Sequence, residues 1–103
     1  MIEIMNLRNT KPSEKWDFYA DRRSPVGNPY PLKGENEEDR NRVCDSYIKW
    51  FNNAIKHNPA VIEYLALLLS CYRLYGKLRL FCWCAPKRCH AETIRSYLQG
   101  TVE

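Results

Sequence analysis

The sequence predicts an α/β fold, in which a small, mostly parallel sheet of three to four strands is flanked by helices. Short strand-like segments occur near the start of the chain and again at residues 78–82, and long segments with helical periodicity lie between and after them. At 103 residues, the chain has the length of one domain with one core. We therefore expect a single α/β domain over residues 1–103.

Three segments are predicted to be strands. Residues 2–5 and 16–20 alternate apolar and polar side chains, as strands with one buried face do. Residues 78–82 form a hydrophobic run that follows a glycine. We predict that this last segment is the centre of the sheet.

Two long helices are predicted between the second and third strands. Apolar side chains recur at helical spacing from Val43 to Ala54, and the acidic run at 35–39 suits the N-terminus of a helix dipole. Asn58 and the proline after it then form a typical helix start, and residues 60–75 are apolar around most of the helix circumference. Such a helix is either deeply buried or part of a surface for self-association.

A last helix is predicted over residues 91–99, with Ile94, Tyr97 and Leu98 facing inward. The chain contains no apolar run near the roughly 20 residues that span a bilayer. Its N-terminus lacks a basic stretch followed by an apolar one, and its five cysteines are odd in number. We therefore expect a cytoplasmic protein with reduced thiols and without membrane attachment.

A loop rich in proline lies between the second strand and the first helix. Residues 21–31 hold three prolines and a glycine, together with Arg22, Ser24 and Asn28. A loop of this length inside a compact domain is more often functional than idle. Its polar side chains are therefore candidates for ligand contacts.

The segment from Cys82 to His90, called the signature loop below, joins the third strand to the last helix and holds three cysteines. Three interpretations remain open. The thiols are buried as small apolar groups in the core. Alternatively, they bind zinc, although the C-x-C-x4-C-H spacing does not match a C-x2-C pair. In the third interpretation, the loop binds an anion.

The anion interpretation combines several features of the signature loop. Lys87 and Arg88 bring positive charge, and the N–H groups of the loop and of the following helix start are free to bind phosphate in this interpretation. A thiol such as Cys89 near a helix start has a lowered pKa, and His90 can act as an acid or a base. This interpretation predicts a ligand site with Cys89 and His90 as catalytic residues.

The chain resembles small phage and bacterial proteins classed as domain of unknown function 4326. The recurring pattern of that family is an early N-x-R, then Y-x-G-R and S-P-x-G-N-P, an R and a Y on a helix, and C-W-C-x-P-x-x-C-H. The matching positions in this chain are Asn6, Arg8, Tyr19, Arg22, residues 24–29, Arg40, Tyr47 and residues 82–90. In one departure, Asp21 stands where the pattern has glycine, and a carboxylate next to Arg22 is expected either to alter the loop or to neutralise a charge meant for a ligand.

The resemblance implies a compact α/β domain with nucleotide-binding-like topology. Together with the residues, it leads to the hypothesis of a site for a phosphate-bearing small molecule, most simply a nucleotide, with hydrolase or transferase activity left open. Arg8 and Arg22 would pair with phosphate, and Asn28 would bind sugar or base. The remaining ligand-binding candidates are Asn6, Ser24, Arg40, Cys84 and Arg88.

Other functions stay open at this point. An interaction protein, such as a phage inhibitor of a host factor, would act in the host cytoplasm and use the helix at 60–75 as a homodimer or partner surface. A net charge of +4 favours nucleic acid only weakly, because dedicated binders cluster their basic residues more densely. No resident metal or cofactor is expected. A pocket joining Arg22, Asn28 and His90 would favour the ligand site over the interaction protein.

Overall fold

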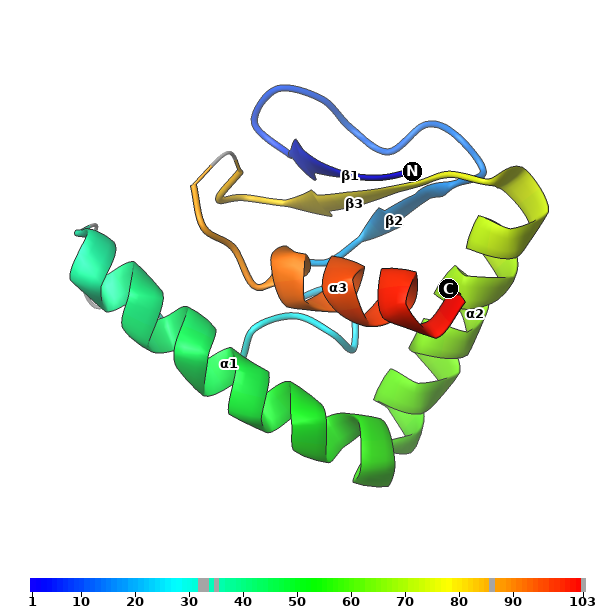
Figure 1. The fold of residues 1–103 in the computed structure, drawn as a ribbon. Coiled ribbons are helices and arrows are strands. Elements are labelled where there is room, and N and C mark those ends of the chain that lie inside the picture. Colours follow the sequence, from blue (N-terminus) through cyan, green and yellow to red (C-terminus); the bar gives the residue numbers. More distant parts are fainter. Residues whose placement is uncertain (32–33, 35, 86, 103) are drawn as a thin grey trace.

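The structure is a computed structural model that describes residues 1–31, 34, 36–85 and 87–102. Three strands and three helices follow one another along the chain in the order strand, strand, helix, helix, strand, helix (Figure 1). They are β1 (Ile2–Asn6), β2 (Asp17–Tyr19), α1 (Glu37–His57), α2 (Pro59–Tyr75), β3 (Leu78–Cys82) and α3 (Ala91–Val102). This is the predicted α/β fold, with α3 three residues longer than expected.

The three strands form one parallel sheet with the order β1-β3-β2. As predicted, β3 is the central strand, and Leu80 is paired with Ile4 on one side and with Phe18 on the other. Because all strands run the same way, their carboxyl ends meet at one edge. This edge therefore brings together the segments that follow the three strands: the first turn after β1, the proline-rich loop and the signature loop.

The helices pack on the same side of the sheet (Figure 1). Leu78, Leu80 and Cys82 belong to the buried core cluster, which also includes Leu68 of α2 and Ile94 of α3. Alternate residues of a strand point to one face, so these three side chains of β3 face the helices together. Burying them holds the central strand, and hence the start of the signature loop, in a fixed position.

Asn58 joins α1 to α2 and caps both helices. Asn58 ends α1 through a bond from its N–H to the Ala54 carbonyl, and its side chain accepts from the N–H groups of Ala60 and Val61 at the start of α2. Gly76 ends α2 with a φ of 71°, a left-handed conformation that glycine adopts without strain. Within the described residues, no helix is long and apolar enough to cross a membrane.

Candidate functional site

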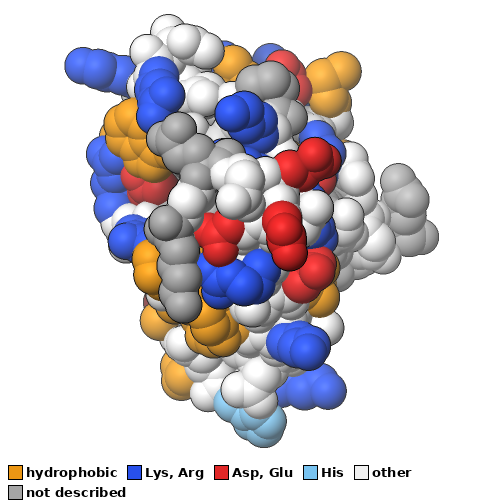
Figure 2. Space-filling view, turned by 90° about the vertical axis from the view of Figure 1, so that its left-hand side faces the viewer, with side chains coloured by type: hydrophobic (Ala, Val, Ile, Leu, Met, Phe, Trp, Pro, Cys, Tyr) orange, Lys and Arg blue, Asp and Glu red, His pale blue; other side chains and the backbone are white. Residues whose placement is uncertain are grey.

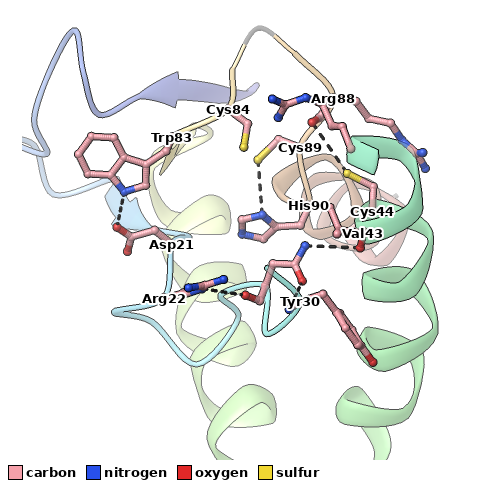
Figure 3. Close-up of a pocket in the computed structure, with 12 residues that line it drawn as sticks. Asp21, Arg22, Tyr30, Val43, Cys44, Trp83, Cys84, Arg88, Cys89 and His90 are labelled. Atoms are coloured by element: carbon pink, nitrogen blue, oxygen red, sulfur yellow. Dashed lines mark hydrogen bonds between the residues drawn. The ribbon is translucent and has the colours of Figure 1, made fainter. Parts of the chain in front are cut away.

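A pocket of about 370 Å³ opens at the carboxyl edge of the sheet, between the proline-rich loop, the signature loop and α1 (Figure 3). We call it the carboxyl-edge pocket. Its walls are formed by Asp21, Arg22, Asn28, Tyr30, Arg40, Val43, Cys44, Trp83, Cys84, Arg88, Cys89 and His90. Arg22, Asn28 and His90 thus lie around one cavity, although they come from segments far apart in the sequence.

Two tyrosine hydroxyls of the helices hold the chain on both sides of Asp21, one in the proline-rich loop and the other at the end of β2. Tyr47 of α1 donates to the Val26 carbonyl at 2.7 Å, and Tyr64 of α2 donates to the Tyr19 carbonyl at 2.7 Å. The Val26 carbonyl lies in an irregular loop without a regular ladder, so a side chain satisfies it. One wall of the pocket is therefore held by two helices.

Gly27 allows the proline-rich loop to fold back on itself. A Cβ atom at this position would lie 2.5 Å from the Asp21 carbonyl oxygen and 2.6 Å from the Arg22 Cα. Both are backbone atoms, which cannot swing away as a flexible side chain can. The glycine of S-P-V-G-N-P is thus required by close backbone packing directly beside the pocket.

Asp21 does not neutralise Arg22. Its carboxylate pairs with Arg23, with one N–O distance of 2.8 Å, and accepts from the Trp83 indole N–H at 3.1 Å. Burial works against this charge, but hydrogen bonds from Arg23 and Trp83 outweigh it and lower the pKa of Asp21. Ser24 donates to the Asp21 carbonyl and does not line the pocket. Asp21 therefore orients Trp83 and leaves Arg22 without a carboxylate partner among the described residues.

Arg22 and Asn28 differ in how free they are to meet a ligand. The Arg22 side chain is exposed and donates one bond to the Asn28 carbonyl at 3.3 Å. The Asn28 amide already bonds the Val43 carbonyl at 3.5 Å and the Tyr30 N–H at 2.9 Å. Asn28 thus holds the loop against α1, while the guanidinium of Arg22 keeps donors for a ligand.

Asn6, at the end of β1, holds the signature loop from the opposite side. Its side chain donates to the Ala85 carbonyl at 2.6 Å and accepts from the Arg8 N–H at 2.8 Å. Neither Asn6 nor Arg8 lines the pocket. The exposed guanidinium of Arg8 nevertheless lies near enough to Cys84 to favour its thiolate.

The other two arginines of the pocket come from α1 and from the signature loop. Arg88 pairs with Asp45 at 2.9 Å and donates to the Asn41 side chain at 3.0 Å, which ties the signature loop to α1. Arg40 is different. Its Nη1 atom is buried and has no hydrogen-bond partner among the described residues, which is costly for a charged group.

His90 is buried, and its hydrogen bonds define which ring nitrogen carries the proton. Its Nε2 donates to the Ala20 carbonyl, and its ring packs edge-on against Tyr47 at a centroid distance of 5.0 Å. Burial lowers the pKa of His90, so the ring is neutral near pH 7. Since Nε2 carries the proton, Nδ1 is an acceptor, and it lies 3.5 Å from the Cys89 sulfur.

Three thiols of the signature loop are in mutual contact. The Cys89 thiol lies within hydrogen-bonding reach of the sulfurs of Cys84 and Cys82, and this contact lowers the pKa of Cys84 to about 6 and that of Cys82 to about 7. The same two contacts, together with burial, raise the pKa of Cys89. Cys84 also lies beside the Arg40 guanidinium and is partly exposed, whereas Cys82 is 1% exposed. Cys84 is therefore the thiol best placed to react.

Cys44 of α1 completes the sulfur lining of the pocket but is chemically different. Its thiol contacts the Arg88 carbonyl at 3.8 Å, and burial raises its pKa. Throughout the part of the chain that the structure describes, no group of three or more His, Cys, Asp or Glu residues is arranged to hold a metal ion. The Cys89 sulfur instead contacts the sulfurs of Cys82 and Cys84.

The start of α3 is already capped within the chain. The Glu92 carboxylate accepts from the Cys89 N–H at 3.1 Å, and the N–H groups of Glu92 and Thr93 bond the carbonyls of Cys89 and His90. The expectation that this helix start is free to bind phosphate is thus wrong. Positive charge for an anion has to come from arginine side chains.

The sequence pattern missed several members of the pocket. Asp21 appeared only as a departure from a motif, and Trp83 and Cys44 carried no separate signal of function. A signal was present on α1, where Arg40, Val43 and Cys44 are spaced to share one helix face with Tyr47. This face packs against the signature loop, and helical spacing alone could not predict that contact.

Comparison with known proteins gives a family. A family model described as "Domain of unknown function (DUF4326)" matches residues 5–100. No curated protein and no solved structure matches the chain. The match covers β2, β3, α1, α2, both loops of the pocket, the end of β1 and most of α3.

Proposed function

The chain belongs to the DUF4326 family, and we propose that its carboxyl-edge pocket binds a phosphate-bearing small molecule, most simply a nucleotide. The observation that carries this proposal is that Arg40 lines the pocket and that its buried Nη1 has no hydrogen-bond partner among the described residues. The Arg40 guanidinium already contacts the Cys84 sulfur, and its free Nη1 donor would gain a strong, charge-assisted hydrogen bond when an oxyanion enters. Hydrolase or transferase activity on the bound molecule remains part of the proposal.

The charge balance of the pocket supports an anionic ligand. Three arginines line it against one aspartate, and that aspartate is paired with Arg23. Arg88 is engaged by Asp45, which leaves Arg22 and Arg40 to receive phosphate oxygens. On the face shown in Figure 2, basic and acidic side chains are interspersed, so positive charge is not spread as a broad stripe. This pattern suits a small anion better than a nucleic-acid backbone.

The aromatic rim supports a base or a similar flat group. Trp83 is 49% exposed and is held by its bond to Asp21, while Tyr30 is 37% exposed on the proline-rich loop. An ordered indole with an exposed face is a good stacking surface, and such contacts contribute about 1–3 kcal/mol per base. A volume of about 370 Å³ fits a ligand of the size of a nucleoside phosphate.

Calorimetric titration with AMP, ADP, ATP and adenosine tests the proposal. We expect the phosphate-bearing compounds to bind and adenosine to bind more weakly. Arg40→Met should weaken binding at least tenfold, or about 1.4 kcal/mol. Arg42→Met is the matched control, because Arg42 lies on the same helix, pairs with Asp39 and does not line the pocket.

Two results would contradict this function. One is the absence of binding for every compound in the panel. The other is equal affinity of the parent and of Arg40→Met, with both proteins folded. In that event the pocket would be a gap between packed loops, and the arginines would serve only to hold the fold.

A second candidate function is a protein-binding surface on α2. Leu67 and Leu74 are 52% and 74% exposed and lie seven residues apart, so they form one stripe along the helix. Leu65 and Leu68 of the same helix are buried, as its apolar pattern predicts. We propose that this stripe pairs with the same stripe of a second copy of the chain, and sedimentation velocity tests it.

A further inference from the structure

We propose that Cys84 and Cys89 form a dithiol site that exchanges with small-molecule disulfides, with Cys84 as the attacking thiol and Cys89 as the resolving thiol. Cys84 lines the open pocket, and the two sulfurs point toward each other (Figure 3). The Lys87 N–H bonds the Cys84 carbonyl at 2.9 Å, and the Cys89 thiol contacts the Cys84 sulfur. The proposal does not depend on phosphate binding.

The surroundings of the two sulfurs give them different roles. Arg40 and Arg8 lie near Cys84 and stabilise a negative sulfur that a co-reactant can reach from the pocket. Cys89 is 3% exposed and remains a thiol. An accessible thiolate next to a buried second thiol is the arrangement of redox-active cysteine pairs.

The exchange proceeds in two balanced steps. The Cys84 thiolate attacks one sulfur of the disulfide, forming a mixed disulfide and releasing the other half as a thiolate. Cys89 then loses its proton to Nδ1 of His90, which lies 3.5 Å from its sulfur, and the Cys89 thiolate attacks the Cys84 sulfur of the mixed disulfide, which releases the second half of the small molecule as a thiolate. The protein is oxidised to a Cys84–Cys89 disulfide, and the small disulfide is reduced to two thiolates, which become thiols by taking up the proton from His90 and one proton from solvent.

The hydrogen bonds of His90, the proton acceptor in the second step, determine which ring nitrogen can take up a proton. Because Nε2 of His90 donates to the Ala20 carbonyl, the ring presents its lone pair at Nδ1. His90 is neutral and its Nδ1 faces the Cys89 sulfur, so the lone pair is in place to take up the proton that Cys89 must lose, although burial, which lowers the pKa of His90, weakens the ring as a base. Within the proposal, His90 is a base for the resolving thiol.

Oxidised glutathione is the probe, added to the fully reduced protein at pH 7 and followed by peptide mapping without reduction. We expect a Cys84–Cys89 disulfide in the parent chain. Cys89→Ser should stop at a mixed disulfide between Cys84 and glutathione. Cys84→Ser should lower the rate of modification at least tenfold, and Cys71→Ala, which removes a cysteine that does not line the pocket, should behave as the parent.

Several outcomes would overturn the assignment. One is that Cys44 or Cys71 is modified before Cys84. Another is a disulfide between Cys82 and Cys89 in the parent chain. The third is a rate of modification by glutathione that is the same in Cys84→Ser as in the parent. If Cys84→Ser does not fold, Arg40→Met provides the same test with all five thiols present. Its modification at pH 7 should be slower than that of the parent, and an equal rate would contradict the proposal.

Discussion

At the scale of single residues, the chemistry of the site depends on neighbours that come from distant parts of the chain. The sequence alone favoured Cys89 and His90 as the reactive pair, because they stand together at a helix start. The structure buries the Cys89 thiol and presents Cys84 to the pocket beside Arg40, a residue of α1. The motif could reveal that thiols gather here, but not which of them meets a guanidinium.

The ionisation of Cys84 leads to a prediction on pH. The Cys89 thiol, and then Arg40 and Arg8, lower the pKa of Cys84 to about 6 against the opposing effect of burial. Alkylation of Cys84 by iodoacetamide should therefore reach half its maximal rate near pH 6. In Arg40→Met, the midpoint should move to higher pH, because the thiolate loses a stabilising charge.

Peptide mapping at each pH follows this reaction site by site. Cys44, whose pKa is raised by burial, serves as the internal control and should react slowly over the same range. A midpoint for Cys84 in the ordinary thiol range, or one that is identical in Arg40→Met, would show that the guanidinium does not act on this sulfur.

At the scale of elements, periodicity predicted the helices and strands well and the loops poorly. The apolar spacing of α1 indicated that Tyr47 faces inward, and the structure confirms it with a fully buried ring. The target of its hydroxyl, the Val26 carbonyl, lies in an irregular loop whose path follows no repeat. The same is true of Gly27, whose role depends on backbone that folds over it.

Gly27 and Gly100 have different surroundings, so alanine substitutions at these two positions test the close backbone packing of the loop. Gly27→Ala should destabilise the protein by about 1–3 kcal/mol, as overpacking does, because the new methyl group meets rigid backbone. Gly100→Ala should stabilise it by about 0.5–1 kcal/mol, since that position lies in α3 with open space around its Cβ. Urea denaturation gives both values, and equal effects of the two changes would contradict this description of the loop.

At the scale of the whole molecule, the parallel sheet with β3 at its centre was predictable, because one hydrophobic run follows two helices. The residues that meet at the carboxyl edge were predictable only in part. The motif indicated Arg22 and His90, yet it also suggested Asn6 and Ser24, whose side chains are engaged in holding the backbone. Only the structure distinguishes the residues that line the pocket from those whose side chains hold the backbone.

The exposed stripe on α2 gives a prediction about assembly. If Leu67 and Leu74 mediate pairing of two copies, the chain should sediment as a dimer at micromolar concentration. Leu74→Lys should then return it to a monomer. Ile62→Lys is the control, because Ile62 is 44% exposed and lies on another side of the helix. A monomeric parent, or a dimer that persists in Leu74→Lys, would rule out this surface.

The position of Cys84 beside Arg40 has a consequence for how any anion enters the pocket. Near pH 7 the thiolate already acts as a counter-ion, so an incoming phosphate brings a second negative charge to the same guanidinium. The repulsion raises the pKa of the thiol, and the protein takes up protons from the buffer as the ligand binds. The heat of binding should therefore change with the ionisation enthalpy of the buffer, and this dependence should disappear in Cys84→Ser.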